Sequence, residues 1–118
     1  MIADDEPSIL MSLEFLFKKE GYKVFIARDG QEAISIFDQE KPTILILDVM
    51  MPKVDGFEVC QYVRKNKENE NVKIVFLSAK NKESDKDKGL ELGANLYLTK
   101  PFSTRELIKQ INQIALEN

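Results

Sequence analysis

A short aliphatic run that ends at a carboxylate is the feature that most constrains how this chain can fold. The aliphatic residues 45–47 are followed directly by Asp48, and Pro52 and Gly56 then interrupt the pattern. A short apolar run bounded by turn residues predicts a strand that is buried on both faces. Open α/β sheets bind their ligands at the carboxyl ends of such strands. Asp48 therefore either ends a strand or takes part in chemistry.

Apolar runs of this kind alternate with segments of helical periodicity along the whole sequence. We expect strands at residues 1–3, 23–27, 43–47, 72–77 and 95–98. We expect helices at residues 7–19, 31–39, 56–66 and 80–92, and a last helix that begins after its N-cap, Ser103. A strict alternation of strands and helices predicts one parallel α/β sheet that is covered by helices on both faces.

The length of the chain predicts a single domain that spans residues 1–118. Its first strand is short for a strand in the middle of a sheet, so we expect that strand to be truncated at Met1. The expected helix at 80–92 is heavily charged, and its few apolar anchors are Leu90 and Leu92. We therefore expect this helix to be held loosely and to be able to move.

The composition excludes several classes of function. The formal net charge is −3, from 17 Lys and Arg against 20 Asp and Glu, whereas domains that bind nucleic acid usually carry a basic excess. No apolar run is long enough to span a membrane, and no basic segment followed by an apolar one suggests a signal peptide. Cys60 is the only cysteine, which is typical of a reducing, cytoplasmic setting. The sequence has no histidine, which excludes catalytic, metal-binding and phosphorylated histidines.

Polar side chains follow four of the five expected strands. Asp4 and Asp5 follow the first, Asp48 the third, Ser78 the fourth and Lys100 the fifth. Because the strands are expected to be parallel, these side chains should meet at one edge of the sheet. Carboxylates at such close quarters repel each other by about 4 kcal/mol per pair at roughly 4 Å, so a functional site needs a cation. Hard oxygen ligands without histidine favour Mg²⁺, with Mn²⁺ as the alternative, and this equipment suits phosphoryl transfer.

These motifs together resemble the receiver domain of response regulators, the CheY-like family of two-component signalling. The resemblance covers Ile2 to about Ile114, and it rests on Asp4-Asp5, Asp48 with Met51-Pro52 and Asp55-Gly56, Ser78-Ala79, and Lys100-Pro101-Phe102. It implies a flavodoxin-like, doubly wound sheet of five parallel strands in the order 2-1-3-4-5. With five helices, that sheet forms a three-layer sandwich.

The resemblance also assigns roles to the acidic residues. Asp48 is expected to accept a phosphoryl group from the phosphohistidine of a partner kinase. Asp5 is expected to bind Mg²⁺ directly and Asp4 mostly through water, while the backbone carbonyl of Met50 supplies a further ligand.

Ser78 is expected to bond a phosphoryl oxygen once Asp48 is modified, and Lys100 to pair first with the carboxylate and then with the phosphoryl group. Tyr97 matches the aromatic residue that moves inward when Ser78 shifts, and the bond before Pro101 is cis in the family.

The resemblance implies partners as well. They are a sensor histidine kinase or phosphotransfer protein, a downstream output domain or target protein, and a second copy bound through the fourth helix, the fifth strand and the fifth helix. Direct binding to nucleic acid or membrane is not expected of this segment.

Three other functions compete with this interpretation. A receiver that acts without phosphorylation, purely as an interaction module, usually lacks one of the acidic or lysine positions, and none is missing here. A phosphatase with an aspartate nucleophile needs a second carboxylate two residues on, where this chain has Met50. A flavodoxin would bind a flavin phosphate after the first strand, and the acidic residues 4–6 would repel it. A switch that holds a phosphoryl group, and does not turn over substrates, fits the residues best.

Overall fold

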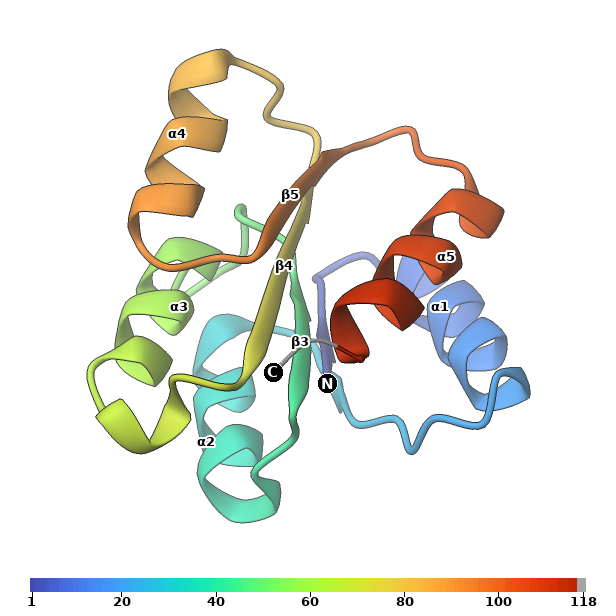
Figure 1. The fold of residues 1–118 in the computed structure, drawn as a ribbon, viewed down its shortest axis with the longest axis horizontal. Helices are drawn as coiled ribbons and strands as arrows, with labels where there is room; N and C mark the ends of the chain where they lie inside the picture. The colour runs from blue at the N-terminus through green and yellow to red at the C-terminus, as the bar shows by residue number, and fades with distance from the viewer. Residues whose placement is uncertain (117–118) are drawn as a thin grey trace.

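The computed structural model describes residues 1–116, in which five parallel strands form one sheet in the order β2-β1-β3-β4-β5 (Figure 1). The strands are β1 (Ile2–Ala3), β2 (Ile26–Ala27), β3 (Ile44–Leu47), β4 (Lys73–Ser78) and β5 (Leu96–Thr99). The helices are α1 (Pro7–Lys19), α2 (Gly30–Glu40), α3 (Gly56–Arg64), α4 (Glu83–Glu91) and α5 (Thr104–Ala115), with a 3-10 turn at Lys67–Asn69. The flavodoxin-like α/β fold expected from the sequence is confirmed.

The helices cover the sheet in two layers. Figure 1 shows α1 and α5 on one face and α2, α3 and α4 on the other. Side chains alternate between the faces along a strand, so Leu45 and Leu47 pack under α2 and α3 while Ile46 packs under α1 and α5. All three are buried, which explains why β3 is an unbroken apolar run. Within residues 1–116, no helix is long and apolar enough to cross a bilayer.

The register of the strands aligns their carboxyl ends. The N–H of Asp48 donates to the carbonyl of Ala3 over 2.9 Å, which sets Asp48 beside the end of β1. On the other side of β4, the N–H of Lys100 donates to the carbonyl of Ser78 over 2.8 Å. The ends of four strands therefore lie at one edge of the sheet.

Side-chain caps fix where three helices begin. The side chains of Asp29, Asp55 and Ser103 each accept a hydrogen bond from the backbone N–H three residues on. Such caps satisfy N–H groups that have no partner within the helix. At α3 the bond is reciprocal, because the Glu58 side chain accepts from the N–H of Asp55. At α5 it is not, because the Glu106 carboxylate accepts from Gln110 instead.

The prediction for the fourth helix was wrong in two respects. Residues 80–82 lie outside α4, and Leu90, expected to anchor it, is 48% exposed. Gly89 is the residue of α4 that is buried. One residue along a helix turns the side chain by about 100°, so Gly89 facing the sheet leaves Leu90 facing away. Strand β2 is also shorter than expected, because its neighbour β1 pairs only through Ile2 and Ala3.

Arg64, the last residue of α3, ties two loops together. Its guanidinium donates to the carbonyls of Gly93 over 3.0 Å, Asn69 over 2.7 Å and Val72 over 2.6 Å. It also donates to the side-chain oxygen of Asn95 over 3.1 Å. The turn that follows α4 is therefore bound to α3 and to the start of β4.

Candidate functional site

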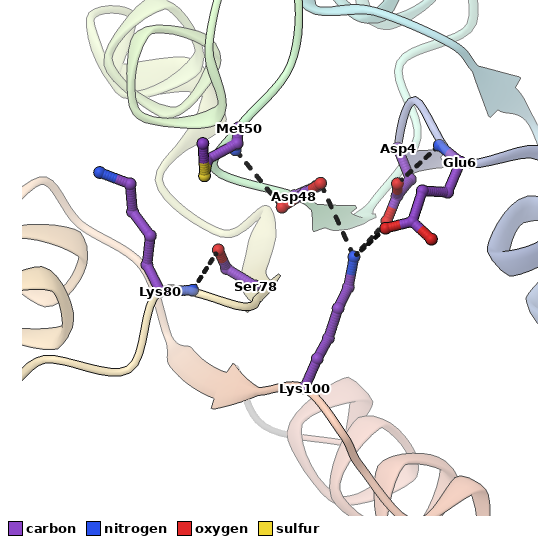
Figure 2. A network of polar contacts seen from close by, with 7 residues as sticks. All are labelled: Asp4, Glu6, Asp48, Met50, Ser78, Lys80 and Lys100. Carbon is purple, nitrogen blue, oxygen red and sulfur yellow. Dashed lines mark hydrogen bonds and ion pairs between the residues drawn. The ribbon is translucent and has the colours of Figure 1, made fainter.

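Three charged side chains from different strands meet at the carboxyl edge of the sheet, as Figure 2 shows. The Lys100 ammonium lies 3.0 Å from Asp4 Oδ2 and 3.7 Å from Asp48 Oδ2. The side chains of Asp4 and Asp48 are almost completely buried, and that of Lys100 is 14% exposed. The ammonium therefore neutralises part of the negative charge that the two carboxylates bring into the fold.

Backbone groups hold both buried carboxylates in position. Asp48 Oδ1 accepts from the N–H of Met50 over 3.3 Å, and Asp4 Oδ1 accepts from the N–H of Glu6 over 2.9 Å. These are local Asx-type bonds, which orient a carboxylate relative to its own loop. The second oxygen of Asp4 is taken by Lys100. Asp48 Oδ2 lies 3.7 Å from Lys100, farther than Asp4 Oδ2 at 3.0 Å. Asp48 is therefore the carboxylate that is better placed to react.

The environment changes the pKa of both Asp48 and Lys100. Burial, together with repulsion by Asp4, raises the pKa of Asp48 to about 6, although Lys100 and the N–H of Met50 oppose the shift. Burial alone would lower the pKa of Lys100, but its hydrogen bond to Asp4 and the charge of Asp48 raise it overall. At neutral pH the site therefore holds an ionised but poorly solvated Asp48 next to a protonated lysine.

This raised pKa predicts that stability depends on pH. The ordinary pKa of Asp48 is 3.8, so between that value and about 6 the folded chain binds more protons than the unfolded chain. The free energy of unfolding in EDTA should therefore fall as the pH rises from about 4 to about 7. The expected fall is about 2 kcal/mol, since solvent at the edge of the sheet screens part of the effect.

The comparison is with Asp48→Asn, which lacks the titrating group. Urea denaturation across the same pH range should show the wild type losing stability relative to Asp48→Asn. If the free energies of unfolding of the two proteins change in parallel with pH, the pKa of Asp48 is not raised in the folded chain.

The acidic residues at this edge could hold a metal ion. Oxygen atoms of Asp4, Asp5 and Asp48 all lie within 4.8 Å of one another. Asp5 is exposed whereas the other two are buried, so the cluster opens to solvent on the Asp5 side. Lys100 already offsets part of the charge of Asp4. Hard carboxylate oxygens in this arrangement fit Mg²⁺, which keeps several waters and uses few protein ligands.

Ser78 and Tyr97 are linked through one backbone residue. Ser78 is fully buried, and its hydroxyl accepts from the N–H of Lys80 over 3.2 Å. The hydroxyl of Tyr97 donates to the carbonyl of Lys80 over 2.8 Å. The ring is 7% exposed and lies 5.8 Å from that of Phe76, centre to centre. Tyr97 is thus buried next to Phe76 and bonded to the loop that follows Ser78.

With this geometry in place, comparison with known proteins decides the family. A sequence model described as "Response regulator receiver domain" matches residues 1–112. The chain belongs to this family.

Solved structures agree with this assignment. The receiver domain of the Francisella response regulator 1452 is 34% identical, with a TM-score of 0.87 over 96% of this chain and 92% of that one. The Vibrio cholerae chemotaxis protein CheY4 is 30% identical, with a TM-score of 0.88 over 96% and 94%. A BeF3-activated receiver domain of Klebsiella pneumoniae RstA shares the fold, with a TM-score of 0.90 over 98% and 97% at 23% identity. Receiver domains are signalling switches and not turnover enzymes.

The receiver domain brings together the residues that the sequence singled out. Asp4, Asp5, Asp48 and Lys100 form one cluster, with Ser78 at the end of the neighbouring strand. Met50 contributes its backbone N–H, and its side chain is 58% exposed. The peptide bond between Lys100 and Pro101 is cis.

Two contacts near the receiver site were not predicted from the sequence. The Glu6 carboxylate lies 3.7 Å from Lys100, so three carboxylates share that ammonium. A Cβ at Gly56 would lie 2.2 Å from the backbone oxygen of Asp48, so only glycine lets α3 begin this close to the site. The acidic run after β1 was a visible signal for Glu6, but the approach of Gly56 to Asp48 depends on tertiary structure.

A larger hollow lies at the opposite edge of the sheet. This cavity of about 610 Å³ is bordered by Met1, Tyr22, Lys23, Pro42 and Ile44, among others. None of the residues that line it belongs to the acidic cluster. This cavity is therefore separate from the receiver site.

Proposed function

We propose that this chain is a phosphorylation-controlled switch in which Asp48 is the phosphoacceptor. The observation that carries the proposal is the buried Asp48 carboxylate, held between Lys100 at 3.7 Å and the Met50 N–H at 3.3 Å. Its raised pKa of about 6 still leaves it largely ionised at neutral pH, so a nucleophile is present.

The reaction is a transfer from nitrogen to oxygen. An oxygen of Asp48 forms a bond to phosphorus while the bond between phosphorus and the histidine nitrogen of the donor breaks. The electron pair stays on the imidazole, which then takes up a proton, and Asp48 becomes an acyl phosphate. Lys100 stays close enough to pair with the transferred group, and the Ser78 hydroxyl can donate to one of its oxygens.

Mg²⁺ is the proposed cofactor. Asp5 and Asp48 would hold the ion directly, with the carbonyl of Met50 as a further ligand and Asp4 acting through water. That role for Asp4 is supported by its existing bonds to Lys100 and to the N–H of Glu6. When bound, the ion supplies positive charge that offsets the carboxylates and the incoming phosphoryl oxygens.

The proposed partners follow from this chemistry. The donor is the phosphohistidine of a sensor histidine kinase or of a phosphotransfer protein. The added charge draws Ser78 and its loop toward Asp48, and this favours the inward state of Tyr97. The α4–β5–α5 surface would pass the change to an output domain, a target protein or a second copy.

Phosphoryl uptake tests this function. With Mg²⁺ and acetyl phosphate, intact-protein mass spectrometry should show one added phosphoryl group on the wild type. EDTA should slow uptake by about 100-fold, because the metal charge is lost. Asp5→Asn should need far more Mg²⁺ to reach the same rate.

Asp87→Asn is the matched control, since it removes an exposed carboxylate on α4. It should behave as the wild type does. Absence of any uptake by the wild type would contradict the proposal and would favour a receiver that works without phosphorylation.

A further inference from the structure

Helix α4 rests on the sheet at a residue without a side chain. Gly89 is buried, and a Cβ built there would lie 2.9 Å from Cδ2 of Tyr97 and 3.0 Å from Cδ2 of Phe76. Real Cβ atoms essentially never come so close to another heavy atom, so either the ring or the helix would have to shift. The buried place of Tyr97 therefore depends on the absence of a side chain at position 89.

The contacts around this point decide which group would give way. Phe76 is completely buried on a central strand and packs edge-on against Phe57, with ring centres 5.2 Å apart. The helix cannot easily rise, because the turn after it is held where Arg64 donates to Gly93. Tyr97 lies on the edge strand β5 and is 7% exposed, so it is less enclosed than Phe76. A side chain at position 89 would therefore displace Tyr97.

We propose that Gly89 is a positioning residue for the switch, because it leaves the space in which Tyr97 lies inward. Two hydrogen bonds link the buried Tyr97 ring to the phosphoacceptor edge. The Tyr97 hydroxyl donates to the carbonyl of Lys80, and the Lys80 N–H donates to the hydroxyl of Ser78. The role of Gly89 in switching rests on the proposed function. Its effect on the position of Tyr97 does not depend on that function.

The test uses Gly89→Ala in the whole chain, without metal or phosphodonor. The chain has three tyrosines, so 3-fluorotyrosine labelling gives three fluorine NMR signals, and Tyr97→Phe assigns the one that matters. In the wild type the Tyr97 signal should be protected from a soluble paramagnetic agent. In Gly89→Ala it should lose this protection and match the signal of Tyr62, which is 41% exposed.

Leu90→Ala is the matched control, because Leu90 is the adjacent α4 residue and faces solvent. It should leave the Tyr97 signal protected. A protected Tyr97 signal in Gly89→Ala, or the same loss of protection in Leu90→Ala, would overturn the proposal.

A double-mutant cycle keeps the proposal testable if Gly89→Ala folds poorly. When Tyr97→Ala has removed the ring, adding Gly89→Ala should change the unfolding equilibrium about tenfold less than it does in the wild type. If Gly89→Ala changes the unfolding equilibrium equally with and without the Tyr97 ring, the alanine side chain does not clash with that ring.

The last arm separates this inference from the proposed function. Gly89→Ala should still take up one phosphoryl group from acetyl phosphate, since Gly89 does not contact the carboxylates or Lys100. Its amide shifts at residues 78–80 should respond less to that modification than those of the wild type, and an equal response would count against the switching role. If the wild type takes up no phosphoryl group, the proposed function fails while the fluorine result on Tyr97 still stands.

Discussion

Asp48→Asn should take up no detectable phosphoryl group from acetyl phosphate under conditions in which the wild type is fully modified. The amide has nearly the same shape as the carboxylate, but it is not a nucleophile and is a poor ligand for Mg²⁺. We expect the rate to fall by about a thousandfold or more, as for other lost nucleophiles. Intact-protein mass spectrometry measures it directly.

A second property of the same variant guards against misfolding as the cause. Asp48→Asn removes a charge that burial and Asp4 disfavour, so at neutral pH in EDTA it should be more stable than the wild type. A variant that is stable and yet unmodified locates the nucleophile. If Asp48→Asn accepts the group as well as the wild type does, the assignment of Asp48 is wrong.

Lys100→Met should destabilise the chain and separate modification from switching. The lysine is the cation between Asp4 and Asp48, and its side chain is 14% exposed. Methionine keeps the volume but leaves two buried carboxylates without the cation between them, which should cost about 3 kcal/mol at neutral pH. Part of that loss should return near pH 5, because Asp48, whose pKa is already raised to about 6, is then largely protonated.

Modified Lys100→Met should also fail to signal. With Mg²⁺ it should still take up a phosphoryl group, but the amide shifts of residues 78–80 and of α4 should change little. Lys109→Met removes an exposed lysine on α5 and is the control for both measurements. Wild-type shifts in modified Lys100→Met would show that Lys100 does not couple the two events.

Topology explains why much of the site could be predicted from the sequence. Once the alternation of strands and helices indicates a parallel sheet, the residues that follow each strand must lie at one edge. This rule alone was enough to bring together Asp4, Asp48, Ser78 and Lys100. The caps at Asp29, Asp55 and Ser103 are equally local, because each depends on residues three positions apart.

Tertiary packing explains what the sequence did not reveal. The apolar side chain of Leu90 suggested an anchor, but in a helix as charged as α4 the pattern has too few apolar positions to define its buried face. That face is set by the fit of Gly89 against Tyr97 and Phe76, which depends on distances between elements. The pairing of Glu6 with Lys100 likewise depends on how the loop after β1 folds back.

The hydrogen bonds of Arg64 give α4 a fixed fulcrum. They hold Gly93 and Asn95 at the carboxyl end of the helix, while the other end, at Glu83, follows the loop from Ser78. A nine-residue helix is about 13 Å long, so a tilt of about 10° at the fulcrum moves its far end by roughly 2 Å. The helix can thus pivot about its carboxyl end, so a shift of the loop after Ser78 moves the Glu83 end of α4 most and the end held by Arg64 least.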